Sequence, residues 1–269
     1  MAQLSSLGVI GGGQMGEALI RGMLEAKIIT PAAITVAEPL ASRSRYLEDT
    51  YGITVGRDAQ ELCANCSTLI LAVKPQIMGK VLAAYRPHIT PKHLVISIAA
   101  GITLKYLAQQ LQDGVPLVRV MPNTPALVLC GASAFSLNQA ATDDHRQTVQ
   151  TILEAIGTCV ELPEDQLDAV TGLSGSGPGY VFTFIEAMID GGVRAGLARD
   201  VAEKLTLQTF LGSAKLAMDC KEHPAVLKGR VTSPGGTTIA GIHCLENAGI
   251  RGTIMDAVMA ATARSRELS

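Results

Sequence analysis

The feature that most constrains this chain is a glycine-rich stretch close to its N-terminus, LGVIGGGQMG from Leu7. Gly11, Gly13 and Gly16 fit the spacing G-x-G-x-x-G, after a short apolar run and before a segment with helical periodicity at 14–27. In a strand–turn–helix unit the first glycine permits a tight turn and the second lets a pyrophosphate approach the backbone. The third lets the helix pack on the strand. The stretch predicts a dinucleotide-binding turn.

A second apolar run, at 34–38, supports this prediction because it ends in an acidic residue, Glu38. An acid at the end of the second strand hydrogen-bonds the ribose of a dinucleotide. An isolated glycine turn is the alternative, and the strand–helix context argues against it. The residues expected to contact the cofactor here are Ile10, Gly11, Gly13, Gln14, Met15, Gly16 and Glu38.

Further apolar runs alternate with helical stretches through the first part of the chain, at 69–73, 94–101 and 117–121. This alternation predicts βαβ units and a doubly wound parallel sheet. Ligands bind outside the carboxyl ends of such strands. The expected cofactor contacts at these ends are Ala72, Val73, Lys74, Pro75, Ala99, Ala100 and Asn123. For Lys74, the alternative of a merely solvated side chain remains open.

The pattern changes near Pro163, after which the chain shows helical stretches without a convincing strand. We therefore predict an α/β fold in two domains: a Rossmann-like dinucleotide-binding domain over 1–162 and an all-helical domain over 163–269. The expected helix at 180–195 is apolar on most sides, so it must be buried in a core or against another subunit. The helical domain is accordingly predicted to mediate a homodimer.

Composition excludes several classes of protein. The formal charge of −2 gives no footprint for nucleic acid or an anionic membrane. No apolar run is long enough to span a membrane, and the N-terminus does not resemble a signal peptide, which predicts a cytoplasmic protein. The six cysteines are scattered, as in reduced proteins. Cys63 and Cys66 fit C-x-x-C, for which incidental thiols and a redox or metal role are the two interpretations; no metal site is predicted.

Two loops of small residues occur in the helical part, SGSGP at 174–178 and SPGGTT at 233–238. Both are expected to open a helix, so that free N–H groups and hydroxyls form a cradle for a small carboxylate. The alternative is a pair of ordinary capped turns.

At this point the motifs resemble a known family. GGGQMG, AVKP, SIAAG, MPNTPALV, SGSGPGYVF, FIEAM, GSAKL, EHPAVLK and SPGGTT, in this order, are similar to pyrroline-5-carboxylate reductase from Leu7 to about Leu268. The resemblance implies reduction of 1-pyrroline-5-carboxylate to L-proline, the last step of proline biosynthesis, with NADPH or NADH. It also implies a Rossmann domain, a helical domain, and dimers that often assemble into decamers.

The resemblance further implies that the Thr238 hydroxyl hydrogen-bonds the ring nitrogen of the substrate and is catalytic. The expected substrate contacts are Ser174, Ser176, Gly235, Gly236, Thr237 and Thr238. Family members often carry a hydroxyl residue where this chain has Glu38. The choice between NADPH and NADH therefore stays open, with Ser42, Arg43 and Arg45 as candidate contacts for a 2′-phosphate.

Neither small-residue loop contains His, Cys, Asp or Glu. A ketone reductase needs a general acid for its alkoxide, whereas a cyclic imine can arrive already protonated. The absence of titratable groups thus favours an imine substrate. The alternatives are a 2-keto acid reductase using Lys204 or Lys215, and a cofactor-sensing regulator without turnover. Whether Glu222 reaches the substrate is left open, since a charged first helical turn explains it equally well.

Overall fold

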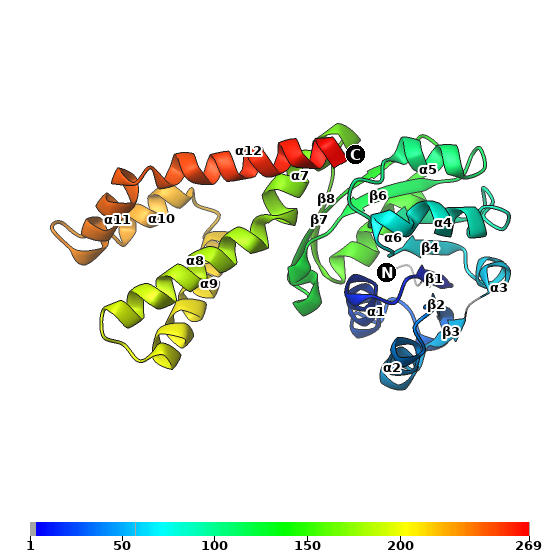
Figure 1. The fold of residues 1–269 in the computed structure, drawn as a ribbon, viewed down its shortest axis with the longest axis horizontal. Helices are drawn as coiled ribbons and strands as arrows, with labels where there is room; N and C mark the ends of the chain where they lie inside the picture. The colour runs from blue at the N-terminus through cyan, green and yellow to red at the C-terminus, as the bar shows by residue number, and fades with distance from the viewer. Residues whose placement is uncertain (1–3, 57, 269) are drawn as a thin grey trace. The chain divides into compact units, whose positions relative to one another are not determined.

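The computed structural model describes residues 4–56 and 58–268, which form two compact units (Figure 1). The first unit comprises the described residues up to Ser176 together with the end of the chain from Ala260. The second unit is Gly177–Met259. No helix within the described ranges combines the length and apolar character needed to cross a membrane.

The first unit is built on a sheet of eight strands in the order β3-β2-β1-β4-β5-β6-β7-β8. Its strands are β1 Leu7–Ile10, β2 Ile34–Ala37, β3 Thr54–Gly56, β4 Thr68–Leu71, β5 Leu94–Ser97, β6 Leu117–Met121, β7 Gly131–Leu137 and β8 Gly157–Glu161. The chain runs outward from β1 to β3, returns to β4 on the other side of β1, and then continues to β8. This reversal beside β1 places a switch point, where α/β sheets bind ligands, next to the glycine turn.

The predicted parallel sheet is confirmed for β1 to β6, whereas β7, whose direction was not predicted, runs antiparallel to β6. Between these two strands lies a short 3-10 helix, Thr124–Val128. A parallel crossover needs a connection of a dozen or more residues, so a link this short can only reverse the chain. β8 then pairs parallel to β7 after a helical crossover.

Helices cover both faces of the sheet. They are α1 Gln14–Glu25, α2 Ala41–Tyr51, α3 Ala59–Asn65, α4 Pro75–Tyr85, α5 Leu104–Gln110 and α6 Asp143–Glu154. Apolar side chains of α1, α2 and α6 pack in one core and those of α3, α4 and α5 in another. Both cores are mostly aliphatic, as a chain with five tyrosines, four phenylalanines and no tryptophan requires. Because both faces are covered, β1, β4 and β5 are buried at every position and consist mostly of apolar residues.

The remaining helices confirm the all-helical second half. They are α7 Leu167–Val170, α8 Gly177–Arg194, α9 Arg199–Cys220, α10 Pro224–Arg230, α11 Thr237–Asn247 and α12 Ile250–Leu268. The predicted boundary after residue 162 follows the last strand, whereas the compact units divide after Ser176. The difference arises because α7 packs against β7, and because the end of α12 belongs to the first unit.

The second unit leaves large apolar side chains exposed within the single chain. Phe182 on α8 is 64% exposed and Met218 on α9 is 75% exposed. No residue of α8 is fully buried, although α8 and α9 pack against each other. Burying such side chains is worth roughly 1.5–3 kcal/mol each, so this unit gains stability from a partner surface.

Candidate active site

The glycine turn has the predicted strand–turn–helix geometry. Gly11 adopts φ +106°, and a Cβ there would lie 2.5 Å from the carbonyl oxygen of Ala72. A Cβ on Gly16 would lie 2.5 Å from the carbonyl oxygen of Gly11. Glycine is therefore required at both positions, for the left-handed turn and for the close approach of α1 to β1.

Gly13 differs from these two glycines, because a Cβ built on it meets nothing within 4 Å. Gly13 is the N-cap of α1, and both it and Gln14 are exposed. The first N–H groups of a helix have no partner inside it, so they are available to an anion. A dinucleotide pyrophosphate fits this turn, because the backbone donors face open space that any side chain at residue 13 would occupy.

The other predicted cofactor residues lie at the same edge of the sheet. The Ala72 N–H donates to the Ile10 carbonyl at 2.8 Å, which places residues 72–75 beside the glycine turn. β4 ends at Leu71, two residues earlier than predicted, and Lys74 is the exposed N-cap of α4. After β5, Ala100 is exposed, while the Ala99 side chain lies in the core and leaves only its backbone for a ligand.

Glu38 directly follows β2 and is fixed by two backbone donors. Its carboxylate accepts from the Gly12 N–H and from the Leu40 N–H, each at 2.9 Å. A Cβ on Gly12 would lie 2.6 Å from a Leu47 methyl group and 3.2 Å from Glu38 Oε2, so a larger residue would displace the buried Leu47 side chain. The acid predicted to meet the ribose thus stands beside the glycine turn.

Arg43 is engaged within the protein. Its Nη2 forms an ion pair with Glu17, its Nε donates to the Gly12 carbonyl at 2.6 Å, and its guanidinium lies 4.9 Å from the Tyr46 ring centre. Glu17 also accepts from the hydroxyls of Tyr46 at 2.9 Å and Tyr51 at 2.7 Å. Burial raises the pKa of Glu17, but the hydrogen bonds from Arg43 and the two tyrosines outweigh it and hold this pKa below its usual value.

This network around Glu17 was not predicted from the sequence. One signal for it was present: Glu17 directly follows the last glycine of the turn, where a pyrophosphate is expected. An acid beside a phosphate site needs a cationic partner. The partner lies 26 positions further along the chain, on α2.

The first small-residue loop has a different conformation from the one predicted. Thr171–Gly175 form a π-helical turn that continues α7, and the Ser176 N–H donates to the Thr171 carbonyl at 2.8 Å. The Ser174 hydroxyl donates to the Val170 carbonyl at 3.2 Å. The prediction that this loop precedes a helix is confirmed, because α8 begins at Gly177 with Pro178 in its first turn. The prediction of free donors is wrong for the Ser176 N–H and the Ser174 hydroxyl, because the small residues let the preceding helix widen into a π turn that takes up both. Such π turns occur often at functional sites.

Asn123 links this π turn to the end of β6. Its Nδ2 donates to the Ser174 carbonyl at 3.0 Å and its Oδ1 accepts from the Ala132 N–H at 2.9 Å. The side chain is 9% exposed. Asn123 was predicted to contact the cofactor, and here it also holds Ser174 in place.

The second small-residue loop does open a helix. Gly236 is the N-cap of α11, and Gly235 adopts φ +66°. The Gly236 N–H donates to the Ser233 carbonyl at 3.0 Å, so the prediction that this N–H is free is wrong. A Cβ on Gly236 would lie 2.2 Å from the Ser233 hydroxyl and 3.1 Å from the Ser233 carbonyl oxygen, so a side chain here would force the Ser233 side chain to rotate.

Thr237 and Thr238 occupy the first two positions of α11, with exposed side chains. Their N–H groups belong to the first helical turn, which has no internal acceptors. Within residues 4–56 and 58–268 the Thr238 hydroxyl makes no hydrogen bond, and Thr238 is not the N-cap. The alternative that Thr238 only caps the helix therefore has no support from the geometry.

The other candidate site residues form structural contacts, are exposed on a helix or are buried in the core. Glu222 forms an ion pair with Arg230 at 2.8 Å. Lys204 and Lys215 are exposed on α9. Cys63 and Cys66 are buried free thiols, and burial raises the pKa of Cys63 to about 11, so this thiol stays protonated near neutrality. This favours the interpretation of Cys63 as an incidental thiol.

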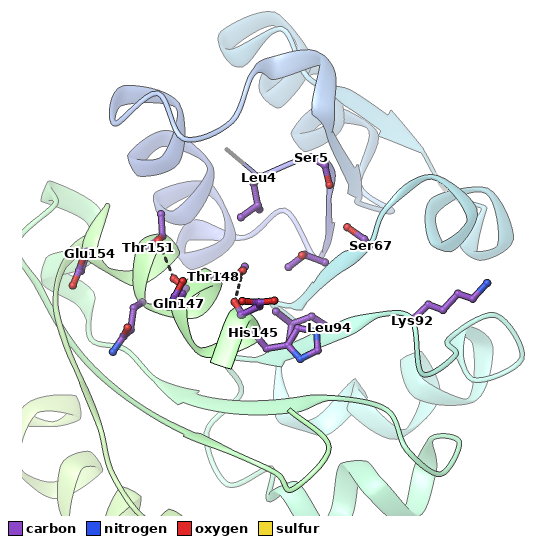
Figure 2. Close-up of a pocket in the computed structure, with 13 residues that line it drawn as sticks. Leu4, Ser5, Ser67, Lys92, Leu94, His145, Gln147, Thr148, Thr151 and Glu154 are labelled. Carbon is purple, nitrogen blue, oxygen red and sulfur yellow. Dashed lines mark hydrogen bonds between the residues drawn. The ribbon is translucent and has the colours of Figure 1, made fainter. Parts of the chain in front are cut away.

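A separate cleft of about 510 Å³ lies at the amino ends of β4 and β5, beside α6 (Figure 2). Lys92, His145 and Glu154 are among its lining residues. His145 Nδ1 accepts from the Thr142 N–H at 3.0 Å and so completes the N-terminal cap of α6. Because parallel strands have their carboxyl ends at the opposite edge, this cleft is distinct from the glycine turn.

Comparison with known proteins finds a matching family for each of the two parts of the chain. Residues 6–101 match a family described as NADP oxidoreductase, coenzyme F420-dependent. Residues 164–268 match one described as pyrroline-5-carboxylate reductase dimerisation. The chain is 48% identical to a pyrroline-5-carboxylate reductase of Synechocystis, over 97% of each chain. It is 46% identical to one of Methanosarcina acetivorans, also over 97% of each.

Solved structures agree with these matches. A pyrroline-5-carboxylate reductase from Coxiella burnetii superposes with a TM-score of 0.94 at 32% identity, over 99% of each chain. The pyrroline carboxylate reductase of Plasmodium falciparum, solved with NADP bound, superposes with a TM-score of 0.89 at 33% identity, over 100% of this chain and 99% of that one. The chain therefore belongs to the pyrroline-5-carboxylate reductase family of NAD(P)-dependent oxidoreductases.

Proposed function

We infer that this chain reduces 1-pyrroline-5-carboxylate to L-proline with NADPH or NADH, the last step of proline biosynthesis. The observation that carries this function is the near full-length identity with curated reductases, which spans both the glycine turn and the helical half. The geometry of the turn at Gly11, Gly13 and Gly16 supports a dinucleotide cofactor, and this support does not depend on sequence identity to relatives.

We propose that the residues of the glycine turn hold the pyrophosphate of the cofactor, with Glu38 beside the adenosine ribose. When bound, the reduced nicotinamide supplies a hydride. Residues 72–75, Ala99, Ala100 and Asn123 lie at the carboxyl ends of β4, β5 and β6 and would line the path of the cofactor toward the substrate. Small side chains and backbone predominate there, so the protein's contribution is mainly orientation.

We propose that the first turn of α11 binds the substrate. The N–H groups of Thr237 and Thr238 face solvent at a helix N-terminus, where they would bind the substrate carboxylate. The Thr238 hydroxyl oxygen would accept a hydrogen bond from the protonated ring nitrogen. Gly235 provides the left-handed backbone that starts this turn. The hydroxyls of Ser174 and Ser176 remain proposed contacts of the substrate.

This arrangement suits an imine better than a ketone. The loop 233–238 has no titratable side chain, and neither has 174–178. A protonated cyclic imine yields a neutral amine on reduction, so no general acid is needed. A 2-keto acid would leave an alkoxide without a proton donor.

Purified protein incubated with NADPH or NADH and 1-pyrroline-5-carboxylate should show loss of the near-ultraviolet absorbance of the reduced nicotinamide. A panel of 2-keto acids serves as the comparison. Turnover of the pyrroline alone supports the proposal. Turnover of a 2-keto acid alone would favour the other reductase class, and cofactor binding without turnover would favour a sensor.

The match to the dimerisation family supports a homodimer formed through the helical half. We propose further that these dimers assemble into decamers and that the protein works in the cytoplasm. The support for a reducing compartment is that all six cysteines are free.

The dimer is expected to be stable at micromolar concentration. Exposed apolar side chains of α8 and α9, among them Phe182 and Met218, need a partner surface, and obligate interfaces bury roughly 2,000 Å² or more. Light scattering of the purified protein measures the mass directly. Phe182→Asp should shift the population toward monomer, whereas Tyr46→Phe, on α2 of the other unit, should not. A stable monomer of the unmodified chain would contradict this prediction.

A further inference from the structure

Gly12 contacts the two side chains, Glu38 and Arg43, that decide whether the site favours the ribose of NADH or the 2′-phosphate of NADPH. The Gly12 N–H donates to Glu38 and its carbonyl accepts from Arg43. A carboxylate at this place accepts hydrogen bonds from the 2′- and 3′-hydroxyls of NADH, whereas a free guanidinium binds the 2′-phosphate of NADPH. The preference for NADH or NADPH therefore depends on whether the Glu38 carboxylate or the Arg43 guanidinium is free to bind the cofactor.

Glu38 is available to ribose hydroxyls. Its two carboxylate oxygens offer about four acceptor positions, of which the Gly12 and Leu40 N–H groups use two. These donors also fix its orientation, so Glu38 does not turn aside for a phosphate without losing both hydrogen bonds. A 2′-phosphate would then face a fixed like charge.

Arg43 is not available. Its guanidinium is paired with Glu17, bonded to the Gly12 carbonyl and stacked on Tyr46. Glu17 is held in turn by the hydroxyls of Tyr46 and Tyr51. Arg45 does not replace Arg43, because two positions along α2 rotate its side chain by about 200° around the helix.

We propose that this chain binds NADH more tightly than NADPH, and that Glu17 helps to set this preference by holding Arg43 away from a 2′-phosphate. Glu38 would then be the residue that meets the ribose, and Glu17 a positioning residue that acts through Arg43. The inference rests on the proposed use of a nicotinamide dinucleotide at the glycine turn.

The test is direct titration of the protein with NADH and with NADPH, without pyrroline, following nicotinamide fluorescence. For the unmodified chain, Kd for NADPH should exceed Kd for NADH by about tenfold or more. Glu38→Ser should lower this ratio by about tenfold, because it removes both the ribose acceptor and the repulsion. Equal affinities, or tighter NADPH binding by the unmodified chain, would overturn the proposal.

Glu17→Gln separates the role of Glu17 from general damage. The amide keeps an acceptor oxygen for the tyrosine hydroxyls but releases the charge of Arg43. NADPH binding should tighten by about five- to tenfold, with NADH binding changed by less than about twofold. Loss of local structure would weaken both cofactors and cannot produce this selective gain.

The double variant Glu17→Gln/Arg43→Met should lose the gain, because the gain depends on the released guanidinium. Glu48→Gln, an exposed glutamate on α2, is the matched control and should leave both constants unchanged. If Glu17→Gln left the ratio of the Kd values for NADPH and NADH unchanged, Glu17 would have no role in the preference. Failure to reduce the pyrroline, with the cofactor constants as expected, would contradict the proposed reaction and leave this preference standing.

Discussion

Replacing Thr238 by alanine should lower kcat/KM for 1-pyrroline-5-carboxylate roughly 30- to 1,000-fold. The change removes one hydrogen bond to the reacting ring, worth about 2–4 kcal/mol of transition-state stabilisation. The folded state loses little, because Thr238 is exposed, is not the N-cap of α11, and its hydroxyl bonds nothing in the described residues. Melting temperature, dimer mass and cofactor Kd should therefore stay near those of the unmodified chain.

Two further variants sharpen this test. Thr238→Ser keeps the hydroxyl and should recover most of the activity. Thr50→Ala removes an exposed hydroxyl on α2 and should have no effect. A Thr238→Ala protein with a lowered melting temperature and near-native kcat/KM would show a structural residue and end the catalytic assignment.

Replacing Arg119 by methionine should destabilise the first unit by at most about 3–5 kcal/mol, the loss expected when one partner of a fully buried ion pair is removed, since Glu164 and Asp168 are partly exposed. The Arg119 side chain on β6 is 6% exposed and lies 3.3 Å from Glu164 and 3.8 Å from Asp168. Glu164 also accepts from the Leu104 N–H, and Asp168 from the Ser265 hydroxyl near the end of α12. In the variant, the carboxylates of Glu164 and Asp168 would lose the guanidinium that faces them.

Thermal unfolding at matched protein concentration measures this effect, since the stability of a dimer depends on concentration. Arg146→Met is the control. Arg146 also pairs with two acids, Asp143 and Glu161, but in the solvent-exposed region of α6 and β8. Surface pairs of this kind contribute little, so its melting temperature should hardly change. Similar losses in the two variants would contradict a special role for the buried pair.

Much of the fold could be predicted because it is encoded locally. The close approach of Gly16 to the Gly11 carbonyl oxygen lies within one strand–turn–helix unit, which the glycine spacing identifies. The apolar runs of β1, β4 and β5 follow from burial on both faces. The residues of β7 do not indicate its direction, whereas the shortness of the link between β6 and β7 does.

The candidate site was less predictable, because its decisive contacts join distant positions. Arg43 was a candidate contact for a 2′-phosphate, but its pairing with Glu17 on α1 joins positions 26 residues apart and could not be predicted from the spacing. The helix after Ser176 was predicted, but the π turn at Thr171–Gly175 that uses the Ser174 hydroxyl and the Ser176 N–H was not.

The central claim, hydride transfer to a cyclic imine, is tested most directly by isotopic labelling. The protein is incubated with 1-pyrroline-5-carboxylate and with NADH carrying two deuterium atoms at C4 of the nicotinamide. The account predicts L-proline with one deuterium at C5, the ring carbon that was doubly bonded to nitrogen, formed in a one-to-one ratio with oxidised cofactor. Oxidation of the cofactor without labelled proline would contradict it.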